Sequence, residues 1–214
     1  PATAPSTASR SMLFDLIKGK WSQTLCDLFS VPINSLPEIR PTSGHFGSTS
    51  ADGPLGKKVP IRSAIGDQQS SLFGQACFKP GDTKNTYGTG SFILTNLGED
   101  PPPINDGLLT TVAWKLDPRS PLTYAVEGSI FSTGATVQWL RDELGIINKA
   151  SELEQLAMDS QNSGGVVIVP AFSGLGSPWW DPDARGIIVG LTRGVGKAEL
   201  ARATIEALAF QPRD

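Results

Sequence analysis

Four short strand-like segments, separated by glycine-containing turns, limit the possible folds of this chain more than any other feature of the sequence. A strong turn signal, Lys79-Pro80-Gly81-Asp82, precedes them. The segments are rich in β-branched and aromatic residues, so we expect a meander of β-hairpins. They are TKNTY (83–87), SFILTN (91–96), LLTTVAW (108–114) and LTYAVEG (122–128).

Helical and strand-like patterns alternate in the rest of the chain. Before the four segments, the sequence predicts a short helix over 21–29, a strand VPIRSAIG (59–66) and a helix over 68–78. After them, we expect buried strands at VVIVPAF (166–172) and GIIVGL (186–191). The fold class is therefore α/β, or α+β with mixed sheets.

Three helices are expected after residue 128. Ser129 is the expected cap of the first, Gly145 its expected stop, and Ser151 with Glu154 forms an expected capping box for the second. The apolar face of the first holds Ile130, Val137, Leu140 and Leu144, and that of the third, Lys197 to Gln211, holds Leu200, Thr204, Ile205 and Leu208.

Composition excludes several classes of protein. The net charge of -3 gives no basic field for nucleic acid, and one histidine, His45, excludes zinc sites and catalytic triads that depend on histidines. Cys26 and Cys77 are far apart, so we expect small core residues in a reducing compartment. No apolar run is long enough to cross a bilayer, so we expect a cytoplasmic protein without membrane insertion.

Asp67 and Gln68 are the first candidate site residues. They follow Gly66 at the expected start of a helix, where unpaired N–H groups and the helix dipole favour a carboxylate. Asp67 can therefore be either a helix cap or a functional carboxylate. Gln68 can be either a solvated residue of the first turn or a hydrogen-bonding partner of a polyol.

The loop Tyr87-Gly88-Thr89-Gly90 is the second candidate. Its glycines allow positive φ and close approach of backbone N–H groups to an anion, although an ordinary hairpin turn has the same composition. Phe92, two residues later, is equally typical of core packing. Gly134 lies inside the expected helix after Ser129, where glycine costs about 1 kcal/mol relative to alanine, which indicates close approach to another helix or to a phosphate.

The segment PAFSGLGSPWWDPDARG (170–186) offers no clear chemistry. We expect Trp179 and Trp180 to be buried. Asp181 and Asp183 fit local capping of a turn better than a metal site, and we assign them no role.

GDQQSSLFGQ (66–75), KNTYGTGSF (84–92) and PAFSGLGSPWWDPDARG resemble segments of the glycerol kinases in the FGGY carbohydrate kinase family. The resemblance covers essentially the whole chain. It implies an actin, Hsp70 and hexokinase-like ATPase fold of two lobes with the active site in the cleft between them. Residues 1–80 would be the end of the first lobe and 81–214 the start of the second, each incomplete.

The resemblance also implies ATP-dependent phosphorylation of glycerol to glycerol 3-phosphate. Asp67 would be the catalytic base, and Gln68 and Phe92 would contact glycerol. Thr89 would meet the γ-phosphate of ATP, and Gly88, Gly90, Gly134 and Gln138 would contact phosphate or nucleotide. Mg²⁺ would accompany ATP with its ligands mostly outside this chain, and a homo-oligomer would be compatible with the family.

Other family segments are absent from the sequence: the DxGTTSSR-type phosphate loop, the Arg-Glu pair and Tyr that hold glycerol, and the Gly-Gly adenosine loop. We therefore expect an internal piece of a kinase that is inactive alone. Two alternatives stay open. One is a kinase for another polyol or a ketose, and the other is a non-catalytic, actin-like protein that acts by binding or association.

Overall fold

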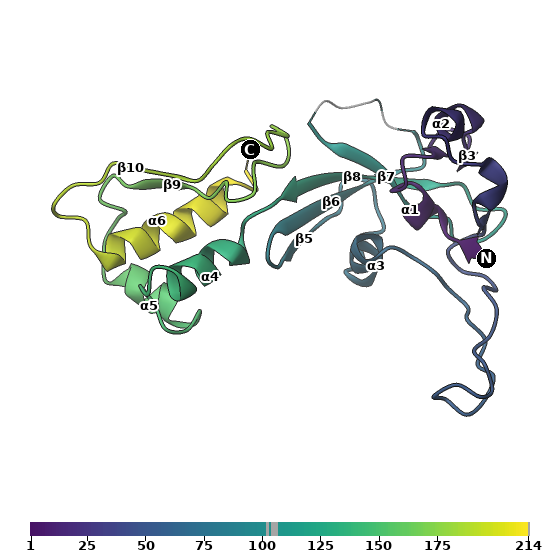
Figure 1. Ribbon diagram of the computed structural model, residues 1–214, viewed down its shortest axis with the longest axis horizontal. Coiled ribbons are helices and arrows are strands. Elements are labelled where there is room, and N and C mark those ends of the chain that lie inside the picture. The colour runs from purple at the N-terminus through teal and green to yellow at the C-terminus, as the bar shows by residue number, and fades with distance from the viewer. Residues whose placement is uncertain (102, 104–106, 214) are drawn as a thin grey trace. The chain divides into compact units, whose positions relative to one another are not determined.

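A computed structural model describes residues 1–101, 103 and 107–213, which divide into two compact units. The first unit takes residues 1–84, 94–105 and 109–127, and the second takes 85–93, 106–108 and 128–214. Figure 1 shows the strands β5 (Thr83–Tyr87), β6 (Ser91–Gly98) and β8 (Thr123–Ile130). Each of these three strands has residues in both units.

All four expected strands between 83 and 128 form, but they do not make a simple meander. With β7 (Leu109–Trp114), they form a sheet in the order β5-β6-β8-β7. Strands β7 and β8 are antiparallel, with Leu109 opposite Glu127 and a register shift between Val112 and Trp114. The connection from β6 to β7 is long, so β7 need not lie beside β6, and β8 takes that place.

The first unit contains short elements, several of which pack around one apolar cluster. Buried Ala8, Phe14, Val112 and Tyr124 form its centre. The elements are β1 (Ala2–Thr3), parallel to β4 (Glu38–Ile39); α1 (Pro5–Ala8); β2 (Phe14–Asp15), antiparallel to β3 (Lys20–Trp21); α2 (Gln23–Leu28); the 3-10 helix η1 (Ile33–Ser35); and α3 (Asp67–Gly74).

Helices α2 and α3 confirm two predictions, whereas the strand expected over 59–66 is wrong. Ser22 caps α2, because its side chain accepts the N–H of Leu25 at 3.3 Å. Residues 43–63 instead form a long loop whose two arms touch at isolated bridges, Ser43 to Ser63 and Ser48 to Pro60. The glycines and prolines of these arms interrupt a regular ladder.

The second unit contains three helices and a small sheet. They are α4 (Gly134–Asp142), α5 (Glu152–Met158), α6 (Lys197–Phe210) and the antiparallel strands β9 (Val167–Val169) and β10 (Ile187–Val189). Two capping predictions are wrong. Ser129 and Ile130 continue strand β8, so α4 begins only after Thr133. Ser151 has helical dihedral angles and its side chain makes no capping bond.

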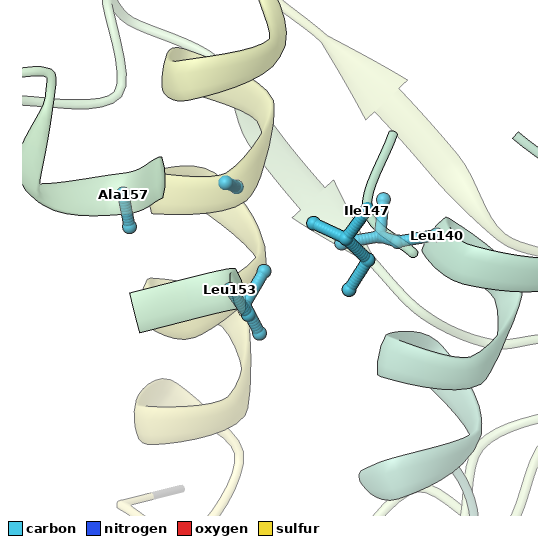
Figure 2. Close-up of a cluster of buried hydrophobic side chains, with 5 residues drawn as sticks. Leu140, Ile147, Leu153 and Ala157 are labelled. Atoms are coloured by element: carbon cyan, nitrogen blue, oxygen red, sulfur yellow. The ribbon is translucent and has the colours of Figure 1, made fainter. Parts of the chain in front are cut away.

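Two apolar clusters hold the second unit together on either side of α6. One joins α4, α5 and α6 through Leu140, Ile147, Leu153, Ala157 and Ala201, and Figure 2 shows Leu140 and Ile147 side by side. The other joins α6 to β9 through Val166, Ile168, Ala203 and Ala207. The expected face of α6 is confirmed in part: Thr204 is buried, and Leu200 and Ile205 are partly buried against the two clusters. The other buried residues of α6 are alanines, Ala201, Ala203 and Ala207, which the sequence did not indicate. Small side chains let α6 approach its neighbours closely.

The strands β9 and β10 are only half buried, which corrects the expectation of fully buried strands. Ile168 is 5% exposed. The alternate side chains lie on the other face and are exposed: Val167 at 49%, Val169 at 38%, Ile187 at 54% and Val189 at 51%. Both cysteines are buried and free, as expected. Within the described ranges, no helix combines the length and apolar character needed to span a membrane.

We predict that Leu140→Ala lowers the free energy of unfolding by about 2–5 kcal/mol, because Leu140 is 0% exposed and its removal leaves a cavity. Urea unfolding of the purified protein measures this loss. Leu144→Ala is the matched control, since Leu144 is 44% exposed, and should change stability by less than about 1 kcal/mol. Equal losses in the two variants would contradict the assignment of Leu140 to the core.

Candidate functional site

Asp67 is the first residue of α3, and its side chain is exposed. Gly66 occupies the N-cap position, so Asp67 is not the cap that a purely structural interpretation requires. Its Oδ1 accepts the backbone N–H of Gln68 at 2.8 Å. The carboxylate therefore has a defined orientation and remains accessible to a ligand.

A buried polar network fixes the beginning of α3 in the first unit. The N–H of Gly66 donates to Oγ of Ser6 at 3.0 Å, and Nε2 of Gln69 donates to Oγ1 of Thr111 at 3.1 Å. Thr111 also pairs with Oγ of Ser9 at 2.9 Å. Buried polar groups with good partners are rigid, because losing a partner is costly. The network thus holds Asp67 and Gln68 against α1 and β7.

Gln68 lies between Asp67 and a buried lysine. Its Nε2 is 3.5 Å from Oδ2 of Asp67, and its Oε1 accepts a hydrogen bond from Nζ of Lys84 on β5. Lys84 is 4% exposed. Burial lowers the pKa of Lys84, and the negative charges of Glu127 and Asp67 and the Cys77 thiol oppose that lowering.

The Gly88–Gly90 loop in the second unit is bound to the beginning of α4. The N–H of Thr133 and that of Ala135 donate to the carbonyl of Thr89 at 2.8 and 3.0 Å. The N–H of Gly134 donates to the carbonyl of Gly88 at 2.9 Å. Hydroxyls of Ser91 and Thr133 pair at 2.8 Å. The loop carbonyls thus accept hydrogen bonds from N–H groups that would otherwise be free to bind an anion.

Gly90 and Gly134 are needed because backbone atoms approach them closely. A Cβ on Gly134 would lie 2.5 Å from the carbonyl oxygen of Gly88, and a Cβ on Gly90 would lie 2.2 Å from that of Ile130. Gly134 is the first residue of α4, not an interior residue as predicted, and the close neighbour is the loop backbone. Neither Gly88 nor Gly90 uses the positive φ that glycine allows, so close approach is the reason for Gly90.

The remaining candidates of the second unit differ in exposure. The side chain of Thr89 is exposed, and that of Phe92 on β6 is half-buried. Gln138 is exposed on α4, one turn after Gly134. The candidates therefore form two sets, with Asp67 and Gln68 in the first unit and the other six in the second.

Residues 178–183 of the segment 170–186 are exposed, which corrects the prediction of buried tryptophans. Trp179 is 66% exposed and Trp180 is 39% exposed. Nε1 of Trp180 donates to the carbonyl of Gly107 at 2.9 Å. Oδ1 of Asp181 accepts the N–H groups of Asp183 and Ala184 at 2.9 and 3.0 Å, so this carboxylate caps its own turn.

The sequence predictions did not include two buried charged residues, Lys84, which contacts Gln68, and Glu127. Lys84 and Glu127 each stand inside a strand-like segment, where charged residues are uncommon. Glu127 is 1% exposed and accepts a hydrogen bond from Arg10 at 3.0 Å. A lysine and a glutamate in two strands of one sheet are a usable signal for a buried pair of opposite charges, since such residues are almost never fully buried unless paired.

Profiles of one family match nearly the whole chain. The C-terminal domain of the FGGY family of carbohydrate kinases matches residues 83–214, and its N-terminal domain matches residues 2–74. These kinases have the actin-like ATPase fold, with which the α/β architecture of this chain agrees. This chain belongs to the FGGY family of carbohydrate kinases.

Curated relatives agree with this assignment. The chain is 52% identical over 209 residues to a glycerol kinase of Caldanaerobacter subterraneus subsp. tengcongensis, covering 98% of this chain and 41% of that protein. It is 52% identical over 213 residues to a glycerol kinase of Symbiobacterium thermophilum, covering 100% of this chain and 42% of that protein. The chain thus spans less than half the length of the relatives it matches.

Solved structures show the same relationship. A Plasmodium falciparum glycerol kinase crystallised with ADP superposes with a TM-score of 0.89 at 38% identity, over 99% of this chain and 42% of that one. A ligand-bound xylulose kinase from Lactobacillus acidophilus superposes with a TM-score of 0.85 at 24% identity, covering 100% of this chain and 43% of that one, and it shows the shared fold.

We predict that Gly134→Ala destabilises the protein by about 1–3 kcal/mol, although alanine is the better helix former, because its Cβ would overlap the carbonyl of Gly88. Thermal and urea unfolding measure the change. Gly74→Ala is the control: Gly74 is also helical, and a Cβ there would meet no atom within 4 Å. A stabilising effect of Gly134→Ala would show that the loop does not press on α4.

Proposed function

We propose that this chain is part of a kinase that transfers the γ-phosphoryl group of ATP to glycerol and forms glycerol 3-phosphate. The observation that carries the proposal is 51–52% identity to several glycerol kinases along 98–100% of the chain. The activity would belong to a protein of the length of those relatives, of which this chain spans about two fifths. We propose a lobe boundary near residue 80, between the two matched profiles.

Asp67 is proposed to accept the proton of the attacking glycerol hydroxyl. Its exposure at the beginning of α3 and its anchored backbone support this role. In phosphoryl transfer through a loose transition state, the hydroxyl loses its proton late. The carboxylate therefore first orients the hydroxyl and then takes the proton as the new O–P bond forms. Gln68 is proposed to bind glycerol beside it, and half-buried Phe92 to contact its carbon atoms.

Thr89 is proposed to donate its hydroxyl to the γ-phosphate. An exposed side chain on a loop whose backbone is fixed by Thr133 and Ala135 supports this role. The N–H groups at the beginning of α4 already donate to the loop carbonyls. The Thr89 hydroxyl, rather than the helix terminus, would therefore contact the phosphate. Gly88, Gly90 and Gly134 would then act mainly by shaping the loop, and exposed Gln138 would reach the nucleotide.

ATP would supply the phosphoryl group, and the hydroxyl donor of Thr89 fits a phosphate oxygen. Mg²⁺ is proposed only as the ion that accompanies ATP. Among the described residues, no group of three or more His, Cys, Asp and Glu side chains could hold a metal ion. We also propose a cytoplasmic location, which two free buried cysteines support.

The direct test is turnover by the full-length protein that contains residues 1–214, with glycerol and a panel of other polyols and ketoses as acceptors. Preferred phosphorylation of glycerol supports the proposal. Preference for another acceptor would overturn the proposal that glycerol is the substrate, while the proposal of kinase activity would stand. No ATP-dependent phosphorylation of any acceptor would overturn the function and favour a protein that acts by binding.

We predict that Asp67→Asn lowers kcat by about 10² to 10⁴ at saturating glycerol and ATP, the usual range for loss of a general base. Asparagine keeps the shape and can accept the N–H of Gln68, so the melting temperature should not change. Asp27→Asn, at an exposed position of α2, is the matched control and should keep full activity. Near-normal turnover of a folded Asp67→Asn enzyme would return Asp67 to a structural role.

We predict that Thr89→Ala lowers kcat by about 10²- to 10³-fold, as loss of one donor to a transition-state oxyanion does elsewhere. Stability should stay constant, because the α4 contacts use the Thr89 carbonyl, which alanine retains. Thr89→Ser keeps the hydroxyl and should recover most of the turnover. Unchanged turnover with a lower melting temperature would make Thr89 a turn residue.

A further inference from the structure

Lys84 is a buried cation next to the proposed acceptor site, and no step of the proposed reaction uses it. Its side chain is 4% exposed in strand β5, a rare position for lysine. Burial lowers the pKa of Lys84, while Glu127, Asp67 and the Cys77 thiol oppose this effect. Retaining such a costly residue requires a structural or functional reason.

The hydrogen bond from Lys84 decides which way the Gln68 amide points. A glutamine amide has an accepting oxygen and a donating NH₂ of nearly the same shape, and either end can face a given neighbour. The lysine ammonium has three donors and no acceptor. Of the two ends of the Gln68 amide, only Oε1 can therefore accept the hydrogen bond from Lys84. This contact leaves Nε2 on the side of Asp67, 3.5 Å from Oδ2.

We propose that Lys84 is a positioning residue, which holds Gln68 so that its Nε2 donates a hydrogen bond to an oxygen of the acceptor polyol beside Asp67. This inference rests on the proposed function. It adds which partner donates in the hydrogen bond between Gln68 and the polyol. A hydroxyl donates its single hydrogen, which Asp67 accepts, and its oxygen can still accept a hydrogen bond. In the flipped amide, Oε1 would compete with Asp67 for that hydrogen.

Glu127 and Arg10 complete the arrangement in the first unit. Glu127 on β8 is 1% exposed and balances the charge of Lys84. Nη2 of Arg10 donates to Oε1 of Glu127 at 3.0 Å, which holds this carboxylate in place. Arg10 therefore holds Glu127, the charge of Glu127 favours the ammonium form of Lys84, and Lys84 donates its hydrogen bond to Gln68.

The test is a double-mutant cycle with Lys84→Met and Gln68→Ala in the full-length protein. Lys84→Met should raise the KM for the acceptor about 3- to 10-fold, the effect of losing one well-placed hydrogen bond. The value of kcat and the KM for ATP should change less than about twofold, as expected when binding is lost equally in ground and transition states. In the Gln68→Ala background, Lys84→Met should have almost no further effect on this KM.

Two further variants make the result specific. Gln68→Glu keeps an acceptor for Lys84 and removes the donor, so it should raise the acceptor KM at least as much as Gln68→Ala. Lys79→Met, an exposed lysine in the turn before β5, is the matched control and should leave both KM values unchanged. If Lys84→Met lowers the melting temperature, the cycle is repeated in the Glu127→Gln background, so that the opposite buried charge is removed together with that of Lys84.

Three outcomes would overturn the inference: an unchanged acceptor KM in folded Lys84→Met, an equal rise with and without Gln68, or tight acceptor binding by Gln68→Glu. The cycle uses whichever acceptor the wild-type protein phosphorylates. If the wild-type protein phosphorylates another acceptor but not glycerol, glycerol is rejected as the substrate, and the role of Lys84 is still tested with that other acceptor. If the wild-type protein phosphorylates no acceptor, the proposed function and this inference fail together.

Discussion

Direct contact between backbone segments, without intervening side chains, is the constraint on which the second unit depends. Gly90 lies against the carbonyl of Ile130, and Gly134 lies against the carbonyl of Gly88. These contacts bring the loop after β5, the end of β8 and the beginning of α4 together, and N–H groups of α4 then bond to the loop carbonyls. A Cβ at either glycine would separate these segments. The position of the Thr89 hydroxyl follows from this packing.

The first unit fixes its candidate residues by a different means. There, side-chain hydroxyls and an amide from distant segments meet under the beginning of α3, through Ser6, Ser9, Gln69 and Thr111. The buried charges of Lys84 and Glu127 lie in strands of the adjoining sheet. Such networks are sensitive to the loss of any one partner, because each remaining buried polar group is then left unsatisfied. A side chain added at a glycine would therefore disturb the candidate residues of the second unit, whereas loss of a buried hydrogen-bond partner would disturb those of the first.

Local patterns predicted most of the elements, because the residues that determine them are close together in the sequence. The four strands from Thr83 to Ile130 and the helix beginning at Asp67 followed from such patterns. The order of the strands could not be predicted, because it depends on which strand fills the space beside β6. The close approach at Gly134 was predicted from its cost in a helix, but its neighbour was not. Ser129 looks like a cap, yet pairing in β8 overrides that preference. The role of Lys84 was missed because its partner Gln68 is 16 positions away.

One face of the β9–β10 sheet exposes apolar side chains. Val167, Val169, Ile187 and Val189 lie on it, and burying one such side chain is worth about 1.5–3 kcal/mol. Association through this face would be driven by the release of ordered water and would weaken on cooling. The melting temperature of the 214-residue chain would then rise with its concentration, because mass action favours the associated folded form. Dilution or low temperature would therefore be the gentlest way to keep the chain dispersed.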